Sequence, residues 1–114
     1  MGIKENINLD RVEEMAEGDD DFRRELLRAI YTSIQEFKIK YVEGLSSHNL
    51  EKLQQARHKI KPTLSLFELK KLNTILQEGK AHVSAKGFED LDLHQNQFRE
   101  ITDELLKDLE EVLE

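Results

Sequence analysis

Hydrophobic residues recur along this chain at steps of three and four positions, which is the spacing of amphipathic α-helices. No stretch shows the alternation of polar and apolar residues that a half-buried β-strand requires. The pattern predicts helices over residues 9–16, from 22 to about 44, from 50 to at least 62, over 67–78 and from 88 or 89 to the C-terminus, with 80–87 as a polar turn region. Long amphipathic helices joined by short connections pack as antiparallel neighbours. We therefore expect an all-α fold: an antiparallel up-down four-helix bundle with a short extra N-terminal helix.

Several of the predicted helix boundaries carry local signals. Asn8 and Asn49 precede the first and third helices, and an asparagine side chain can cap a helix N-terminus. The acidic run 19–21 opens the second helix, because the helix dipole stabilises negative charge at that end. Gly18 and Gly79 are suited to end the first and fourth helices, since glycine adopts the left-handed conformation that commonly follows a helix.

Length and charge narrow the class of protein. A chain of 114 residues predicts one domain, and we expect an N-terminal arm at 1–8, with Ile3 and Ile7 available to pack, followed by a helical bundle over 9–114. The net charge of −7 argues against a nucleic-acid partner and against docking on an anionic membrane, because both require a basic surface. We expect the bundle to be a monomer.

Other chemistries are disfavoured by what the sequence lacks. There is no cysteine, so there is no disulfide framework and no thiolate site. No apolar run approaches the roughly 20 residues that cross a bilayer, and the N-terminus lacks a signal pattern, so we expect a cytoplasmic location. A carboxylate-bridged metal centre in a bundle normally shows Glu-x-x-His pairs on two helices. No such pair occurs, so we expect no metal and no cofactor on this chain.

His58 is the strongest candidate for a functional residue. At about 100° per residue it points away from the apolar stripe of its helix, which consists of Leu53, Ala56, Ile60, Leu64 and Phe67. Lys61 lies less than one turn further on the same polar face. A neutral imidazole nitrogen can accept a phosphoryl group from an acyl phosphate, and a nearby cation offsets the charge that arrives. Spacing alone leaves a second interpretation open, in which His58 is only a solvated surface residue.

The other histidines have simpler interpretations. His94 lies on the apolar stripe of the last predicted helix, where a histidine is usually a hydrogen-bonded core residue. His48 and His82 fall in or near predicted turns and are expected to be solvated.

The sequence around His58 resembles the histidine-phosphotransfer (HPt) domains of two-component phosphorelays. That family carries His-x-x-Lys-Gly on a helix, followed by small residues and a second amphipathic helix. The matching residues here are Ala56, His58-Lys59-Ile60-Lys61, Leu64, Leu69 and Lys70-Lys71-Leu72, with Asp19-Asp20-Asp21-Phe22, Leu26-Leu27 and Asn49-Leu50-Glu51-Lys52-Leu53 upstream. The sequence departs from the family at three positions: Pro62 and Glu68 replace glycines, and Leu64 is bulkier than usual.

The resemblance implies a function and its partners. The chain would be a phosphocarrier rather than a stand-alone catalyst: His58 would accept a phosphoryl group from a phospho-aspartyl receiver domain and pass it to another receiver. The partners would be response-regulator receivers and a hybrid sensor kinase, with the aspartate and the Mg²⁺ supplied by the receiver. The docking face is expected at Gln54, Gln55, Pro62 and Ser65, the polar positions within about 60° of His58 on the helix.

Two further expectations accompany this interpretation. In the family, a polar side chain on the following helix often hydrogen-bonds the other ring nitrogen of the histidine, and Gln77 and Lys80 are the candidates here. Pro62 lacks the backbone N–H that a helix interior uses, which predicts a bend or a widened turn from His58 to Pro62. The altered residues after Lys61 keep an alternative function open: a non-phosphorylated helical adaptor that docks a receiver or a partner helix through the same face.

Overall fold

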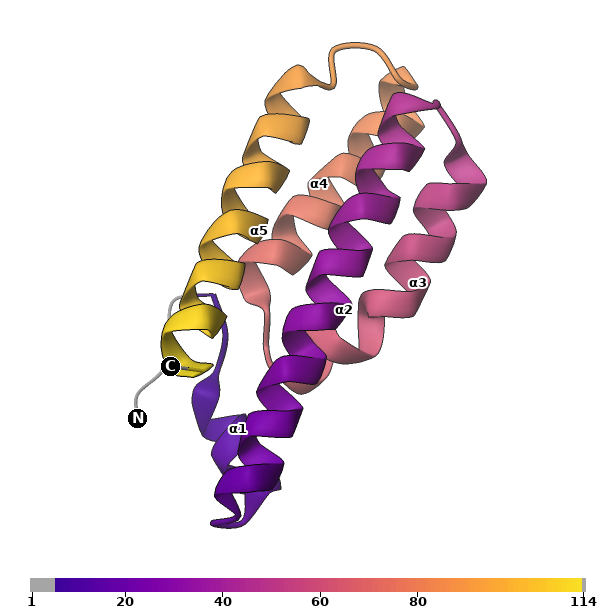
Figure 1. Cartoon of the computed structure of the whole chain (residues 1–114). Helices are drawn as coiled ribbons and strands as arrows, with labels where there is room; N and C mark the ends of the chain where they lie inside the picture. The colour runs from indigo at the N-terminus through magenta and orange to yellow at the C-terminus, as the bar shows by residue number, and fades with distance from the viewer. Residues whose placement is uncertain (1–5, 114) are drawn as a thin grey trace.

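The structure, a computed structural model that describes residues 6–113, contains five α-helices and no β-strand within those residues (Figure 1). The predicted all-α class is therefore confirmed. In chain order the helices are α1 (Leu9–Ala16), α2 (Asp20–Ser46), α3 (Leu50–Leu66), α4 (Lys70–Lys86) and α5 (Asp92–Leu113). The four longer helices lie side by side, and α1 packs against the first part of α2 at one end (Figure 1).

The first three helices begin with side-chain caps. Asn8, Asp19 and Asn49 each accept a hydrogen bond of 3.0 Å through Oδ1 from a backbone amide of the first helical turn. Replacing such a cap by alanine typically costs about 1 kcal/mol. After α1, Glu17 and Gly18 have left-handed φ angles of 49° and 82°. The caps at Asn8 and Asn49 and the stop at Gly18 are where the sequence predicts them.

The core runs along the line where the helices meet. α2 packs against α3 and α5, and α4 packs against α5 and α3. Phe37 and Tyr41 of α2 and Phe98 of α5 form an aromatic cluster at its centre, with Tyr41 and Phe98 rings 4.4 Å apart between centroids. Tyr41 is 1% exposed and Phe98 is fully buried. Ala56 and Ile60 of α3, on either side of His58 in the sequence, belong to the same buried core.

The prediction for the fourth helix is wrong at both ends. α4 begins at Lys70 rather than 67 and runs through Gly79 to Lys86, so most of the expected turn at 80–87 is helical. Gly79 is not a helix stop: it is a buried residue in the interior of α4. A Cβ at residue 79 would overlap the ring of His94 and the hydroxyl of Tyr41. A glycine inside a helix costs about 1 kcal/mol relative to alanine, and the close approach that it permits offsets that cost.

The last helix starts at Asp92 and not at 88 or 89 as the sequence predicts. Gly87 and Asp90 have positive φ angles of 68° and 54°, which interrupt the helical path between α4 and α5. Leu91 is buried at 8% exposure and anchors the connection to the core. Phe88 and Leu91 have the hydrophobic spacing of a helix in the sequence, but both precede the first residue of α5. This spacing is the reason that the predicted start is too early.

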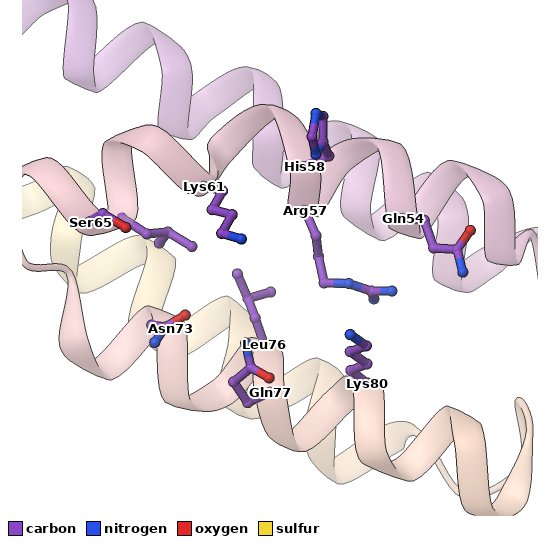
Figure 2. Close-up of a pocket in the computed structure, with 10 residues that line it drawn as sticks. Gln54, Arg57, His58, Lys61, Ser65, Asn73, Leu76, Gln77 and Lys80 are labelled. Carbon is purple, nitrogen blue, oxygen red and sulfur yellow. The ribbon is translucent and has the colours of Figure 1, made fainter.

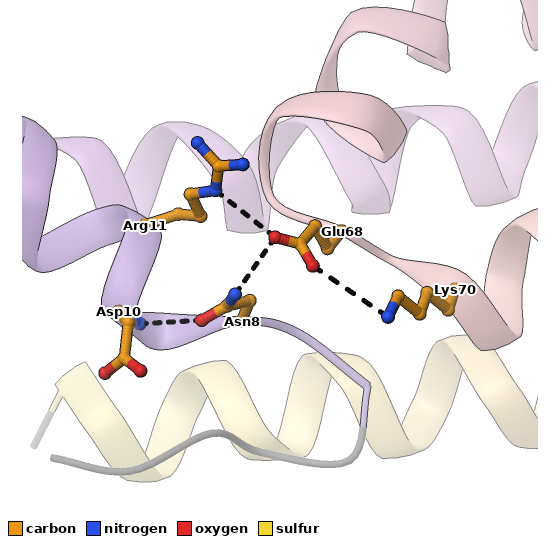
Figure 3. Close-up of polar contacts among 5 residues, drawn as sticks. All are labelled: Asn8, Asp10, Arg11, Glu68 and Lys70. Atoms are coloured by element: carbon orange, nitrogen blue, oxygen red, sulfur yellow. Dashed lines mark hydrogen bonds and ion pairs between the residues drawn. The ribbon is translucent and has the colours of Figure 1, made fainter.

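α3 continues through Pro62 to Leu66 and is α-helical from His58 to Pro62, so the widened turn, one of the two predicted forms, is not present. The other form, a bend of the helix, stays a prediction. Beyond α3, Glu68 has a left-handed φ of 52°, a conformation that glycine adopts more readily. Its carboxylate accepts hydrogen bonds from Asn8 Nδ2 at 3.0 Å and Arg11 Nε at 3.2 Å and lies 3.9 Å from Lys70 Nζ (Figure 3). The bonds from Asn8 and Arg11 lower the pKa of Glu68. Glu68 thus ties α1 to the α3–α4 connection.

The described part of the expected N-terminal arm, residues 6–8, packs on the helices. Ile7 is 1% exposed, Asn6 Nδ2 donates to Asp108 Oδ2 at 3.2 Å, and the amide of Asn8 donates to the carbonyl of Phe67 at 3.0 Å. Ile3, the other arm residue expected to pack, lies outside the described residues.

Candidate functional site

His58 is exposed near the middle of α3, as the helical spacing predicts. The opposite face of the helix carries Leu53, Ala56 and Ile60, which are 0%, 7% and 3% exposed. The imidazole is therefore held on a helix whose other side is fixed in the core. A partner that must enclose this side chain can reach it without unfolding any part of α3.

A groove of about 510 Å³ runs between α3 and α4 beside His58 (Figure 2). Its residues come from both helices: Gln54, Arg57, His58, Lys61, Leu64 and Ser65 from α3, and Asn73, Leu76, Gln77 and Lys80 from α4. Six of the residues predicted from the sequence line this groove. The other two, Gln55 and Pro62, are exposed on α3 and lie outside it.

The groove is basic, although the chain as a whole is acidic. Arg57, Lys61 and Lys80 contribute three cations to the lining, and no carboxylate is among the lining residues. The complete chain has a net charge of −7. A local excess of cations within an acidic protein favours binding of an anion at that place.

The side chains at the groove point in different directions (Figure 2). Arg57 and Lys61 extend from α3 toward α4, and Lys80 and Gln77 extend from α4 toward α3. The ring of His58 points away from α4, at the rim of the groove. Within the described residues no hydrogen bond joins His58 to Gln77 or Lys80, so the orienting role of these two side chains stays a prediction.

Four residues of the lining were not predicted as site residues: Arg57, Leu64, Asn73 and Leu76. Arg57 is the charged one. It is half-buried, and its positive charge opposes the rise in the pKa of Tyr41 that burial causes. A sequence signal for Arg57 does exist. It precedes His58 by one residue, so at about 100° per residue it lies on the same side of His58 as Gln54 and Lys61.

The remaining histidines, all within the described residues, are engaged elsewhere. His94 is 7% exposed, and its Nε2 is 2.7 Å from the hydroxyl of Tyr41. His82 lies on α4, not in a turn, and its Nε2 donates to the carbonyl of Glu89 at 2.6 Å. The ring of His48 stacks on Phe88 with a centroid distance of 4.9 Å. His58 has neither a hydrogen-bond partner nor a ring partner among the described residues, which leaves its nitrogens available for reaction.

No group of three or more His, Cys, Asp or Glu side chains in residues 6–113 is arranged to hold a metal ion. No helix among these residues is both long enough and apolar enough to cross a membrane.

Comparison with known proteins gives no match: no protein-family model, no curated protein and no solved structure is similar to this chain. The relation to HPt domains therefore stays a resemblance in sequence motif, and the geometry around His58 is the basis for assigning a function.

Proposed function

We propose that this chain is a histidine-containing phosphotransfer module of a two-component phosphorelay. The observation that carries the proposal is the position of His58: exposed in mid-helix, at the rim of a groove with three cations and no carboxylate in its lining. In this proposal, α2 to α5 form the antiparallel up-down four-helix bundle of an HPt domain, and α1 is the short extra N-terminal helix. The chain acts as a monomer.

The proposed reaction moves one phosphoryl group between an aspartate and a histidine. A neutral nitrogen of His58 attacks the phosphorus of a phospho-aspartyl group on a receiver domain. The N–P bond forms while the bond between phosphorus and the acyl oxygen breaks, and the aspartate leaves as a carboxylate. The reverse step, with a second receiver, returns the phosphoryl group to an aspartate. The receiver supplies the aspartate and the Mg²⁺, so this chain acts as a carrier and not as a stand-alone catalyst.

The groove cations have a defined part in this reaction. Lys61 lies one helical turn from His58 and points into the groove (Figure 2). A cation at that place stabilises the negative charge of the phosphoryl group in transit and on the histidine. Lys61 is exposed to solvent, so dissolved ions screen its charge. Its effect on phosphoryl transfer should therefore weaken as the salt concentration rises.

The docking face for the receiver is proposed at Gln54, Gln55, Pro62 and Ser65. All four residues are exposed on α3 and surround His58 on the polar side of the helix. A hybrid sensor kinase and one or more response-regulator receivers would bind there in turn. None of these four side chains is charged, so recognition on this face depends on shape and hydrogen bonding.

A non-phosphorylated adaptor is the second candidate function, and one observation favours it. The ring of His58 points away from Lys80 and Gln77 rather than into the groove (Figure 2), and Pro62 adds rigid bulk beside it. An adaptor would bind a receiver through this face without accepting phosphate.

One experiment separates the two functions. A panel of receivers, each phosphorylated with acetyl phosphate and Mg²⁺, is mixed with this protein, and both binding and phosphate transfer are measured. Transfer of acid-labile, base-stable phosphate to this chain is expected for the carrier. Binding of a receiver without any transfer would support the adaptor instead.

A further inference from the structure

The cations of the groove between α3 and α4 have no acidic partner of their own. Arg57 and Lys61 extend into the groove from α3, and Lys80 extends into it from α4 (Figure 2). Within residues 6–113 none of the three forms an ion pair with a carboxylate, whereas several other lysine and arginine side chains do. The chain has 24 acidic residues, so this local separation of charge favours an anion from outside the chain.

The groove exists because its two helices pack chiefly on other helices. α3 lies mainly against α2, and α4 lies mainly against α5. The apolar sides of α3 and α4 are buried, with Ile60 at 3% and Leu72 at 1% exposure, and their polar sides border the groove. A ligand can therefore enter the groove from solvent without any change in the core.

The interior of the groove is separate from the imidazole of His58. The His58 ring points away from α4 at the rim (Figure 2). Besides the three cations, the lining has neutral polar side chains, which are Gln54 and Ser65 from α3 and Asn73 and Gln77 from α4. Their amide and hydroxyl groups can donate hydrogen bonds to anionic oxygens or pair with the polar groups of an organic ligand. An anion in this interior is thus a ligand in its own right and not a phosphoryl group on His58.

Charge and size indicate an anion larger than a single phosphate. One phosphate ester carries about 1.5 to 2 negative charges at pH 7, which is fewer than the positive charges of the groove. Arg57 and Lys61 are four residues apart, or about 6 Å along the helix axis, so their charges are spread along the groove. The volume of about 510 Å³ falls within the range of about 300–1,000 Å³ that is typical of small-molecule sites. Two or more linked phosphates match both the charge and its spread.

Arginine and lysine supply different parts of such a site. The planar guanidinium of Arg57 can donate two parallel hydrogen bonds to one phosphate, whereas Lys61 and Lys80 are point charges on flexible stems that can follow the neighbouring phosphates. Because Lys80 belongs to α4, the ligand would link α3 to α4. The unfolded chain has no groove, so binding would also stabilise the folded protein.

We propose that the groove between α3 and α4 binds a small molecule with two or more linked phosphates, held by Arg57 and Lys61 from one helix and by Lys80 from the other. The site does not depend on the phosphotransfer function and goes beyond it, although Lys61 belongs to both. Two sources share this chemistry, inorganic polyphosphate and a nucleoside di- or triphosphate. For a nucleotide, the amides of Gln54, Asn73 and Gln77 are the groups available to the base and the sugar.

The experiment titrates the protein with pyrophosphate and, separately, with ATP, at constant ionic strength and without divalent cations. Calorimetry measures the affinity, and ¹H–¹⁵N NMR locates the ligand. Saturable binding of one ligand per chain is expected, with the largest shifts of amide signals in 54–65 and 73–80. Orthophosphate should bind about tenfold more weakly or worse, because it forgoes at least one hydrogen bond to a charged group.

Lys80→Gln and Arg57→Gln test the two sides of the groove. Each removes one cation and should weaken pyrophosphate binding about tenfold or more. Lys59→Gln is the matched control, since it removes a cation of α3 that lines a different groove. The control should weaken binding less than about threefold, as expected for an exposed charge without direct contact. Equal losses in Lys80→Gln and Lys59→Gln would overturn the proposal.

The two titrations also identify the source of the phosphates. Equal affinity for pyrophosphate and ATP supports a site for linked phosphates alone, and distinctly tighter binding of ATP supports a nucleotide site. Orthophosphate that binds as tightly as pyrophosphate, or no saturable binding of either polyphosphate, would overturn the proposal. Binding of poly-glutamate but of neither polyphosphate would overturn it in favour of an acidic protein partner.

Discussion

Pro62 lies four residues after His58 on α3, and α3 is α-helical through both residues. In a regular helix the amide of residue 62 would donate to the carbonyl of His58, and proline has no amide to donate. Both side chains are exposed on the same side of the helix. The residue that departs most clearly from the HPt pattern therefore stands at the position whose amide would otherwise bond to the carbonyl of the proposed phosphate acceptor.

The first prediction concerns the stability of α3. A proline in a helix interior costs about 3 kcal/mol relative to alanine. Pro62→Ala restores an amide to the carbonyl of His58, so the free energy of unfolding should rise by roughly 1–3 kcal/mol. This free energy is measured by urea unfolding, with circular dichroism as the signal. Ser65→Ala, another exposed α3 position, is the control and should change stability by less than about 0.5 kcal/mol. A Pro62→Ala protein no more stable than the wild type would contradict the expectation.

The second prediction concerns the choice of receiver. The ring of Pro62 adds rigid bulk on the face of His58, where glycine would leave an open approach. Pro62→Gly should therefore accept phosphate from more receivers than the wild-type protein does. The measurement is the transfer rate from each member of a panel of phosphorylated receivers to both proteins. Identical rates across the panel would mean that the proline has a structural role only.

A third prediction follows from the packing at Gly79. Gly79→Ala should destabilise the protein by roughly 1–3 kcal/mol, because the added methyl group overpacks against the ring of His94 and the hydroxyl of Tyr41. Helix propensity alone predicts the opposite change, an increase of about 1 kcal/mol in the free energy of unfolding. Ser84→Ala, at an exposed position of the same helix, serves as the control for propensity. A stabilised Gly79→Ala protein would show that α4 and α5 are not in close contact there.

The fourth prediction concerns pH. The pKa of His94 is lowered from its ordinary value of 6.5, chiefly by burial. In the unfolded chain the ring therefore takes up a proton at a higher pH than in the folded protein. The stability that neutral His94 contributes is complete above pH 6.5 and is lost progressively as the pH falls below it.

NMR titration of the imidazole protons measures this directly. The His94 signal in the folded protein should titrate at a lower pH than the same residue in urea. A midpoint at or above the value in urea would contradict the account of a buried, neutral ring.

The sequence predicts those parts of this molecule that depend on local chemistry. The side chain of a cap such as Asn8 or Asn49 accepts a hydrogen bond from an amide two or three residues further along the chain. The residues that form the cap are therefore neighbours in the sequence, and the cap can be predicted from them. The exposure of His58 follows in the same way from the spacing of apolar residues on its own helix. The all-helical class is the sum of such local signals.

Features that depend on distant parts of the chain were not predictable. Gly79 has the local appearance of a helix stop, and only the ring of His94 on another helix explains why it lies inside one. Glu68 takes a left-handed conformation that its residue type disfavours, and Asn8 and Arg11 near the N-terminus hold its carboxylate.

The measurement that tests the central claim most directly is phosphate uptake by His58→Gln. Wild-type protein, His48→Gln and His82→Gln should each acquire acid-labile, base-stable phosphate from a phosphorylated receiver, and His58→Gln should acquire none. All four should have the same helical content, and His58→Gln should unfold within about 0.5 kcal/mol of the wild type because residue 58 is exposed. Label that persists in a folded His58→Gln protein would contradict the account.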